Sequence, residues 1–366
     1  MIKARSTGCQ PNYAIPPGET LRETLETIGM KQAELAERTG RPKKTINEIV
    51  AGKAAITAET ALQLERVLGI PASFWNNLER NYRESLARLK EEEELRTQGK
   101  WLNTFPVSAL TKMGWIPKVD SPAKTLRAIF NFFGVAGIEE WRFFWENPRA
   151  DYRDSKVYEA NRPAIAAWLR KGEIEAAKLE TKPYNLRAFR MALREIRSVT
   201  VKPPEIFEPG MRNFCAESGV AVVFVPELPG THVYGATRWL KATKPLIQMS
   251  LRGKTDDHLW FTFFHEAGHL LLHGKDELFI EGSDQGYKGE EREEKEQEAN
   301  RFSQDFMIPP QEYQTFVQDR QFDLTSIRRF AEKLGIPPGI IVGRLQHDRV
   351  ISFNHGNTLK KRFRFS

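Results

Sequence analysis

The sequence predicts a mostly α-helical protein with an α+β domain toward its C-terminal end. Three observations support this fold class. Over most of the chain, apolar residues recur at intervals of three and four, the spacing of one face of a helix. Glycine or proline separates these segments and ends the helices. Runs rich in β-branched residues, which are typical of strands, occur only after residue 205.

The length of 366 residues is enough for two or three domains. We expect a five-helix domain over residues 1–88, a helical linker or sensing region over 89–205, and an α+β domain over 206–366. The net charge of +7 permits a nucleic-acid partner without requiring one. The two cysteines, Cys9 and Cys215, match no metal-ligand spacing.

The chain shows no sign of export or of membrane insertion. Its first residues, MIKARSTGCQPNYAIPPGE, lack the apolar core of a secretory signal. The longest apolar stretches are too short to cross a bilayer. The low cysteine content is typical of a reducing compartment. We therefore expect a cytoplasmic protein with no membrane partner.

Five helices are expected in the first domain, each bounded by a recognisable stop or start. Helical patterns end at Gly29, Gly40 and Gly52, because glycine is favoured just after the end of a helix. Thr57 is a good N-cap for the fourth helix. A fifth, longer helix begins at Pro71.

The second and third of these helices have the layout of a helix-turn-helix. A recognition helix contacts base edges from its N-terminal turns, and basic groups there can also bind phosphates, which position the protein without specifying sequence. The alternative is a helical bundle that makes protein contacts only. The candidate DNA-binding residues are Gln32, Arg41, Lys43, Lys44, Thr45, Asn47 and Lys53.

The middle region, residues 100–205, contains several helical patterns and many aromatic residues. These features favour a helical core over an aromatic ligand site, and the region carries no catalytic motif. Three short strands are then expected, in GVAVVFVP (219–226), GATRWL and PLIQMSL. The last of them could offer an edge to an extended peptide. The helix DDHLWFTFFHEAGHLLLH follows, and after it a second helix that ends at Pro309 and a final helical pair.

Within the helix DDHLWFTFFHEAGHLLLH, His265, Glu266 and His269 form the motif H-E-x-x-H. Residues four apart lie on one face of a helix, so both imidazoles can reach one cation. Glu266 can then take a proton from water activated by the metal, the general-base role in a metallopeptidase. Gly268 costs the helix roughly 1 kcal/mol relative to alanine, which indicates a close backbone approach at this point.

A catalytic zinc site needs a third protein ligand and one open position. In the next helix, Glu296 lies on the same side as the apolar Ala299 and is the predicted third ligand for Zn2+. Glu298 is displaced by roughly 200° around the helix and remains the alternative. Asn300, four residues after Glu296, could hold a ligating histidine by its other nitrogen.

Other polar residues near the motif have two interpretations each. His273 lies one turn beyond His269 and either contacts the groups around the metal or is a structural histidine. A donor to the developing oxyanion is also needed, and His232, Tyr234 and Arg238 precede the motif helix. Packing or surface roles are the alternative for these three residues.

The segment GATRWL…PLIQMSLRGKTDDHLWFTFFHEAGHLLLH…EQEANRFSQDFMIP resembles the ImmA/IrrE family of zinc metallopeptidases over about residues 210–345. The resemblance implies a zincin-like fold with a small sheet, zinc ligands at His265, His269 and Glu296, and Glu266 as the base. Members of this family typically cleave a DNA-bound repressor in a stress or mobile-element response. Ser303 departs from the family pattern, which usually has alanine there.

Residues 16–85, from PPGETLRETLETIGM to FWNNLERNY, resemble a HigA-type antitoxin of the Cro/repressor-like (XRE) superfamily. The resemblance implies a homodimer that binds a palindromic double-stranded DNA operator, often its own promoter. Pro42 departs from the small polar residue usual at its position. Proline is tolerated at the first helical position, so we expect the fold to persist, although proline cannot make the hydrogen bond to a base that a polar side chain would make there.

Two functions are therefore expected from the sequence. The first is a DNA-binding transcription regulator with a zinc-dependent endopeptidase domain that cleaves a repressor or another regulatory protein. The alternative is a HigA-type antitoxin or sensor that represses its own operon. In that case it binds a partner protein such as a toxin, and its peptidase fold has no turnover.

Overall fold

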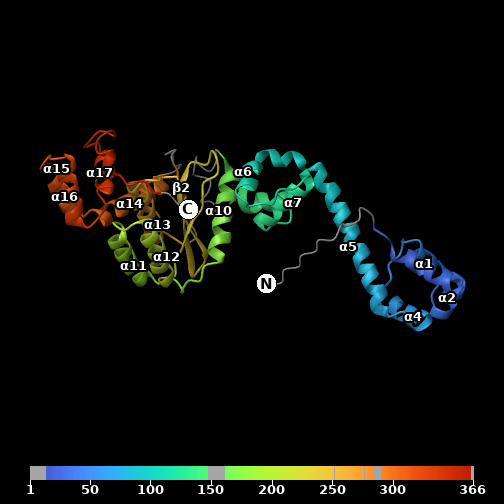
Figure 1. Ribbon diagram of the computed structural model, residues 1–366. Helices are drawn as coiled ribbons and strands as arrows, with labels where there is room; N and C mark the ends of the chain where they lie inside the picture. Colours follow the sequence, from blue (N-terminus) through green and yellow to red (C-terminus); the bar gives the residue numbers. More distant parts are fainter. Residues whose placement is uncertain (1–13, 147–160, 251, 276, 283–289, 364–366) are drawn as a thin grey trace. The chain divides into compact units, whose positions relative to one another are not determined.

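The computed structural model describes residues 14–146, 161–250, 252–275, 277–282 and 290–363 (Figure 1). Cys9 and the segment considered as an export signal up to residue 13 lie outside these residues. Contacts divide the chain into two compact units, which are Met1–Lys100 with Asp120–Leu126 and Trp101–Val119 with Arg127–Ser366. None of the helices in the described parts of the chain is long and apolar enough to cross a membrane.

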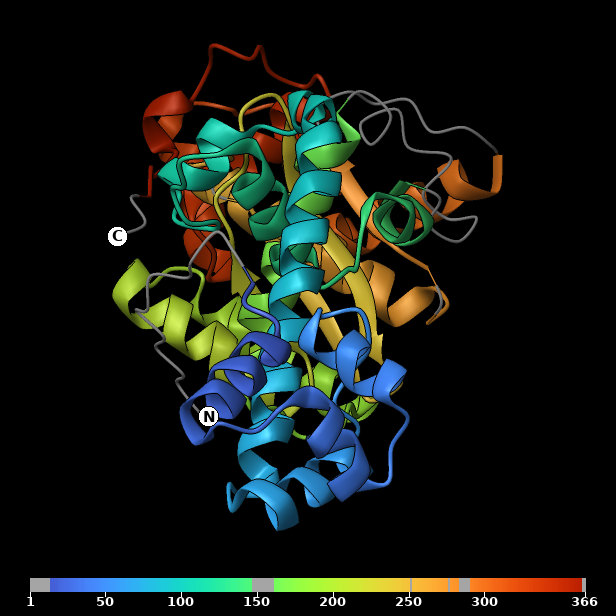
Figure 2. The same cartoon turned by 90° about the vertical axis from the view of Figure 1, so that its right-hand side faces the viewer.

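The first unit contains the five helices expected from the sequence. Thr57 is the N-cap of the fourth helix, as predicted, and its side chain accepts a hydrogen bond from the backbone N–H of Thr60. The helices enclose an apolar core in which Trp75 is fully buried. Figure 2 shows these helices in blue to cyan. Their bounds are α1 (Pro17–Ile28), α2 (Gln32–Thr39), α3 (Lys43–Val50), α4 (Ala58–Leu68) and α5 (Ala72–Thr97).

The helices of the second unit surround one small sheet, so the predicted fold class is confirmed. The division between the units falls within α7. The remaining α-helices are α6 (Val107–Lys112), α7 (Pro122–Phe133), α8 (Ile138–Trp141), α10 (Arg162–Ala177), α11 (Leu186–Val199), α12 (Pro204–Glu217), α13 (Asp256–Leu272), α14 (Glu290–Met307), α15 (Pro310–Gln318), α16 (Leu324–Leu334) and α17 (Pro338–His347). There are also short 3-10 helices, η1 (Gly99–Thr104) and η4 (Asn357–Leu359), and a short π-helix, η2 (Arg142–Glu146).

The sheet is mixed and has the strand order β1-β3-β2-β4. β1 pairs in parallel with β3, whereas β2 is antiparallel to both β3 and β4. The expectation that PLIQMSL offers an edge to a peptide was wrong, because this segment forms β3 and has a neighbour on each side. The bounds are β1 (Ala221–Phe224), β2 (Val233–Lys241), β3 (Lys244–Met249) and β4 (Phe279–Gly282).

Helices cover both faces of this sheet (Figure 1). Alternate residues of a strand point to opposite faces. Val222 and Ile247 accordingly belong to the core shared with α12 and α13. Ala221 and Leu246 belong to a second core shared with α10. The helix that carries H-E-x-x-H therefore packs against one face of the sheet.

Helix α13 is buried at its first two residues, Asp256 and Asp257. The side chain of Asp256 is 0% exposed, and its Oδ1 accepts hydrogen bonds from the backbone N–H groups of Asp257 and Lys361 at 3.0 and 3.1 Å. Lys360 lies 2.6 Å from Asp257 Oδ2. These contacts attach the C-terminal segment to the start of α13. Burial, with a smaller effect from Asp257, raises the pKa of Asp256 to about 7.

Because its pKa is raised, the Asp256 carboxyl is expected to lower the stability of the folded protein at alkaline pH. The folded state favours the protonated carboxyl, so the free energy of unfolding falls as pH rises from the ordinary value of 3.8 to about 7. Asparagine stays neutral and keeps an oxygen that can accept both backbone hydrogen bonds. We expect Asp256→Asn to unfold a few degrees above the wild type at pH 8, on the order of 1 kcal/mol or more, and with little difference at pH 4.

Circular dichroism melts between pH 4 and 8 measure this effect. The exposed Asp319 offers a matched control, because Asp319→Asn should follow the wild-type profile. Parallel profiles for Asp256→Asn and the wild type would show that the Asp256 carboxyl does not titrate as its surroundings imply.

Candidate metal centre and candidate DNA interface

Two helices bring the predicted metal ligands together. His265 and His269 lie one turn apart on α13, and Glu296 comes from α14. All three residues are 3% exposed or less. The two Nε2 atoms are 2.9 Å apart, and Glu296 Oε2 lies 3.2 Å from that of His265 and 3.4 Å from that of His269. The three residues form a group that could hold a metal ion.

The spacing of these atoms fits a small divalent cation. In a tetrahedral site with bonds of about 2.0–2.2 Å, neighbouring ligand atoms are about 3.3 Å apart. The three measured distances lie within 0.4 Å of that value. Both imidazoles also aim their Nε2 atoms at the same carboxylate oxygen, while the other oxygen of Glu296 has no hydrogen bond among the described residues. The donor set therefore suits a metal.

The outer nitrogens of both histidines are held by hydrogen bonds. His265 Nδ1 lies 3.0 Å from Asn300 Oδ1, the contact expected of Asn300. His269 Nδ1 lies 3.0 Å from His273 Nδ1. His273 Nε2 in turn lies 3.1 Å from Glu298 Oε2. The two neighbouring acids thus face different partners: Glu296 lies beside both candidate ligands, and Glu298 lies beside His273.

Two glycines make room for the centre. A Cβ on Gly268 would lie 3.2 Å from Ala299 Cα, so the close backbone approach inferred from the sequence is present between α13 and α14. A Cβ on Gly235 of β2 would lie 2.5 Å from Glu266 Oε1. The absence of both side chains lets α14 and the sheet close around the motif. Ser303, which departs from the alanine of the family pattern, donates a hydrogen bond from its hydroxyl to the carbonyl of Phe261 at 2.9 Å. The buried hydroxyl therefore has a hydrogen-bond partner.

The centre concentrates acidic groups in a buried space. Glu266 is 0% exposed, and neither of its carboxylate oxygens has a hydrogen-bond partner among the described residues. Burial raises its pKa well above the ordinary value, and Glu281 and Glu296 add to the effect. A carboxyl with a raised pKa can accept a proton near neutral pH, as a general base requires.

The pKa values of the two histidines shift in opposite directions in these surroundings. Burial, with His265 nearby, lowers the pKa of His269 to about 3. Burial acts on His265 in the same way, but the carboxylates of Glu281, Glu296 and Glu266 outweigh it and raise its pKa to about 9.

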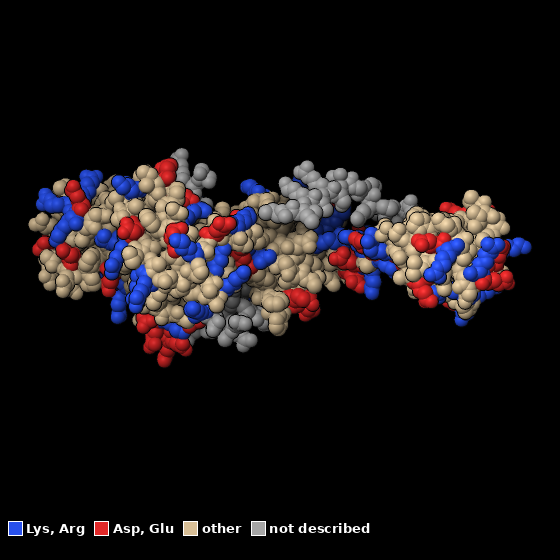
Figure 3. Space-filling model, turned by 90° about the horizontal axis from the view of Figure 1, so that it is seen from below, with Lys and Arg blue, Asp and Glu red and all other residues tan. Residues whose placement is uncertain are grey.

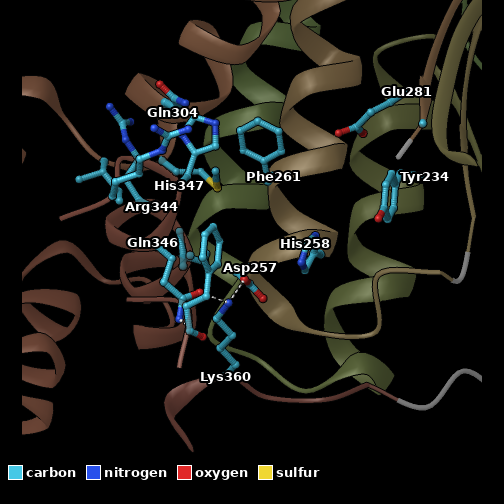
Figure 4. Close-up of a pocket in the computed structure, with 17 residues that line it drawn as sticks. Tyr234, Asp257, His258, Phe261, Glu281, Gln304, Arg344, Gln346, His347 and Lys360 are labelled. Carbon is cyan, nitrogen blue, oxygen red and sulfur yellow. Dashed lines mark hydrogen bonds and ion pairs between the residues drawn. The ribbon is translucent and has the colours of Figure 1, made fainter. Parts of the chain in front are cut away.

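A cavity of about 670 Å³ adjoins the same helix (Figure 4). Phe261 lies in its wall one turn before His265, and the two rings stack with centroids 5.9 Å apart. Tyr234 and Glu281 line the side of the sheet, whereas Arg344 and His347 line the opposite side. This volume is within the range typical of ligand sites. The cavity and Glu281 were not predicted, because no local motif marks residues that only the fold brings together.

The three candidate oxyanion donors are far from equivalent. Tyr234 lines the cavity. Arg238 instead donates to Glu173 at 2.9 Å and to the carbonyl of Leu169, both on α10 at the other face of the sheet. His232 is exposed in the turn before β2. Of the three, Tyr234 alone borders the cavity beside the motif helix.

In the first unit, the candidate DNA-binding residues surround α3. Buried Ile46 and Ile49 fix one face of this helix, so Lys43, Lys44 and Asn47 are exposed on the other side. Lys53 follows α3 and is exposed, while Gln32 opens α2 and Thr45 is half-buried. Pro42 is the N-cap of α3, one position before the helical position expected for it.

Arg41 differs from the other candidates because it is folded back onto α4. Its guanidinium lies 3.2 Å from Glu59 and donates to Gln63. A DNA contact by Arg41 would therefore require release from Glu59. Acidic and basic side chains alternate on the face of this unit visible in Figure 3, so that face has no large surface of one charge.

Comparison with known proteins identifies two domains. The model of the IrrE N-terminal-like domain, of the peptidase M78 type, matches residues 215–346. A helix-turn-helix model matches residues 21–75. The first range contains the buried histidine–glutamate group, and the second contains α2 and α3.

Individual relatives match a short part of the chain. Virulence-associated protein I of Dichelobacter nodosus is 43% identical over 70 residues, which are 19% of this chain and 65% of that protein. An addiction module antidote protein of the HigA family from Coxiella burnetii is 33% identical, and the match covers 23% of this chain and 92% of that one with a TM-score of 0.22. The Pseudomonas aeruginosa antitoxin HigA, solved with the higBA promoter, is 32% identical over 22% of this chain and 90% of that one, with a TM-score of 0.22.

The two family models agree with the arrangement of helices and polar groups described above. The chain carries an N-terminal helix-turn-helix domain that resembles HigA antitoxins and, after it, an IrrE N-terminal-like domain of the M78 peptidase family.

Proposed function

We propose that this protein is a transcription regulator that binds a double-stranded DNA operator and hydrolyses a peptide bond in a repressor or another regulatory protein. The observation that carries the proposal is the buried group of two imidazoles and one carboxylate beside the unpaired carboxylate of Glu266. Burying so many ionisable groups costs stability, and such arrangements are typical of functional sites.

We assign the group to Zn2+. Two imidazole nitrogens and one carboxylate are the ligands of a known class of catalytic zinc sites, and they leave a fourth position for water or substrate. When bound, zinc would polarise the peptide carbonyl and lower the pKa of a water molecule. His265, His269 and Glu296 would hold it.

Glu266 would act as the general base in this reaction. Its carboxylate is buried beside the ligands and has no competing hydrogen bond in the described structure. It can therefore take a proton from the attacking water and return it to the nitrogen of the leaving group. Gly235 opposite it leaves the space that the carboxylate occupies, because a Cβ there would lie 2.5 Å from Glu266 Oε1.

The cavity beside α13 is the space proposed for the substrate. On α13 it is lined by Asp257, His258 and Phe261, and the ring of Phe261 stacks on His265 one turn further along the helix. Tyr234 borders the cavity and would donate to the carbonyl oxygen. β4 has only β2 as a described neighbour. An extended peptide could pair with this strand and reach the centre, the role first expected of PLIQMSL.

A second candidate function is that of a HigA-type antitoxin or sensor whose peptidase fold binds a partner without turnover. The observation that favours it is the burial of the centre. His265, Glu266, His269 and Glu296 are all 3% exposed or less, so a polypeptide needs a local opening to reach them. The partner would then be a toxin or another regulatory protein.

Glu266→Gln separates the two functions. Glutamine keeps the shape of the side chain but cannot accept the proton, so we expect about one zinc per chain as in the wild type and a loss of cleavage of about 100-fold or more. Protein from the host cell is incubated with either form, and new N-termini are counted by mass spectrometry. The same new N-termini with Glu266→Gln would refute its role as base. Capture of an intact partner by both forms, with no new N-termini, would support the antitoxin function.

For DNA, we propose that Lys43 and Asn47 contact base edges in a homodimer, and that Gln32, Lys44, Thr45 and Lys53 contact phosphates or the groove edge. Lys43 and Asn47 are exposed one turn apart at the start of α3, where a recognition helix meets the bases. Arg41 would join them only after it leaves Glu59.

Replacing Lys43 and Asn47 together by alanine should weaken operator binding by about 30-fold or more, since each base contact contributes on the order of 1–3 kcal/mol. Fluorescence anisotropy with DNA from upstream of the gene measures the loss, and wild-type affinity should fall steeply with salt. Asn77→Ala with Lys90→Ala, two exposed positions on α5, is the matched control. Equal affinity of both double variants would rule out α3 as the recognition helix.

A further inference from the structure

His273 is a buried polar residue without a role in the proposed reaction. It follows the last residue of α13, and its side chain is only 3% exposed. Both of its ring nitrogens are engaged, Nδ1 by His269 and Nε2 by Glu298. It is therefore not available as a further ligand, and it is not a member of the group that could hold a metal.

The hydrogen bonds around His273 fix the direction of each proton. A carboxylate can only accept, so His273 Nε2 must carry the hydrogen in the bond to Glu298. Neutral His273 then has a free electron pair on Nδ1, which accepts the hydrogen of His269 Nδ1. Neutral His269 is thereby left with an electron pair on Nε2, the atom that faces Glu296 and His265.

The order of groups is thus Glu298, His273, His269 and then the candidate metal position. This chain of hydrogen bonds connects the exposed carboxylate of Glu298 on α14 to the buried imidazole of His269 on α13. The other histidine of the centre is held in the same sense by the side-chain oxygen of Asn300. Phe279 stacks on His269 with ring centroids 3.9 Å apart and leaves this imidazole little freedom to turn.

We propose that His273 and Glu298 are a positioning pair for the metal centre. They hold His269 in the tautomer and orientation that present Nε2 to a divalent cation, and the charge of Glu298 strengthens the imidazole as a donor. This inference rests on the metal centre of the proposed function but not on its peptidase activity. It gives the two acids of α14 separate tasks, with Glu296 on the metal and Glu298 behind the histidine.

Zinc affinity of the purified full chain tests the pair, measured by competition with a chromophoric chelator. Loss of the acceptor in His273→Ala should weaken zinc binding about 10- to 100-fold. His273→Asn should recover most of it, because Asn Oδ1 can take the place of Nδ1. Glu298→Ala should cause a smaller loss. Glu294→Ala removes an exposed acid one turn earlier on α14 and should bind as the wild type does.

The visible spectrum of the Co2+ form gives a second readout that does not depend on activity. We expect an altered ligand-field band in His273→Ala and a wild-type band in His273→Asn. If His273→Ala fails to fold in circular dichroism, His273→Asn and Glu298→Ala decide the question. Equal zinc affinities for Glu298→Ala and Glu294→Ala, with no loss in a folded His273→Ala, would overturn the positioning role.

These outcomes are distinct from a failure of the proposed function. A wild-type chain that binds neither zinc nor Co2+ would refute both the metal centre and the positioning pair. Normal metal binding that is unaffected by the variants would refute the pair alone. Weakened zinc binding by His273→Ala would support the positioning pair even if the wild-type chain cleaves no protein. In that case the sensor function would replace the peptidase function.

Discussion

The contact between α13 and α14 at Gly268 and Ala299 is the constraint on which the candidate metal centre depends. Glu296 lies one turn before Ala299, so its reach is set by how closely the two helices approach. A Cβ on Gly268 would lie only 3.2 Å from Ala299 Cα, so even a methyl group would require one of the two helices to shift. The glycine in the middle of this helix thus permits the close approach that brings Glu296 beside the two imidazoles.

The rest of the second unit holds this contact in place. The sheet supports α13 from one side. Trp260, Phe263 and Phe264 of this helix are buried in the adjoining hydrophobic core. The C-terminal segment is attached to the start of α13 through Asp256 and the Lys360–Asp257 ion pair. The motif helix is therefore immobilised on several sides, as a site with precisely placed ligands requires.

Much of this arrangement could be predicted from the sequence because its signals are local. Helical spacing and glycine stops located α1 to α5, and the apolar side of the helix after H-E-x-x-H favoured Glu296 over Glu298 as the third ligand. Three elements could not be predicted in this way. β4 has only four residues and needs β2 to complete it. α12 contains Pro209 within it, and α15 begins directly after Pro309, a residue type that normally indicates a helix end.

Other features depend on contacts that no local pattern encodes. The binding of Arg41 to Glu59, the position of Arg238 at the far face of the sheet, and the cavity beside Phe261 all arise from residues distant in sequence. The division of the chain at residues 88 and 205 and the sensing role of the middle region stay predictions. The metal ligands were easier to predict than the burial of the centre. The motif specifies the ligand residues, whereas their exposure to solvent depends on the whole fold.

Zinc-edge X-ray absorption on the purified protein tests the central claim most directly, because it reports the ligand atoms themselves. With His265, His269 and Glu296 as ligands, the spectrum should fit nitrogen and oxygen neighbours at about 2.0–2.2 Å, with the outer-shell scattering of two imidazoles and no sulfur. A shell that contains sulfur, a shell without imidazole scattering, or zinc that dialysis removes completely would contradict a metal centre between α13 and α14.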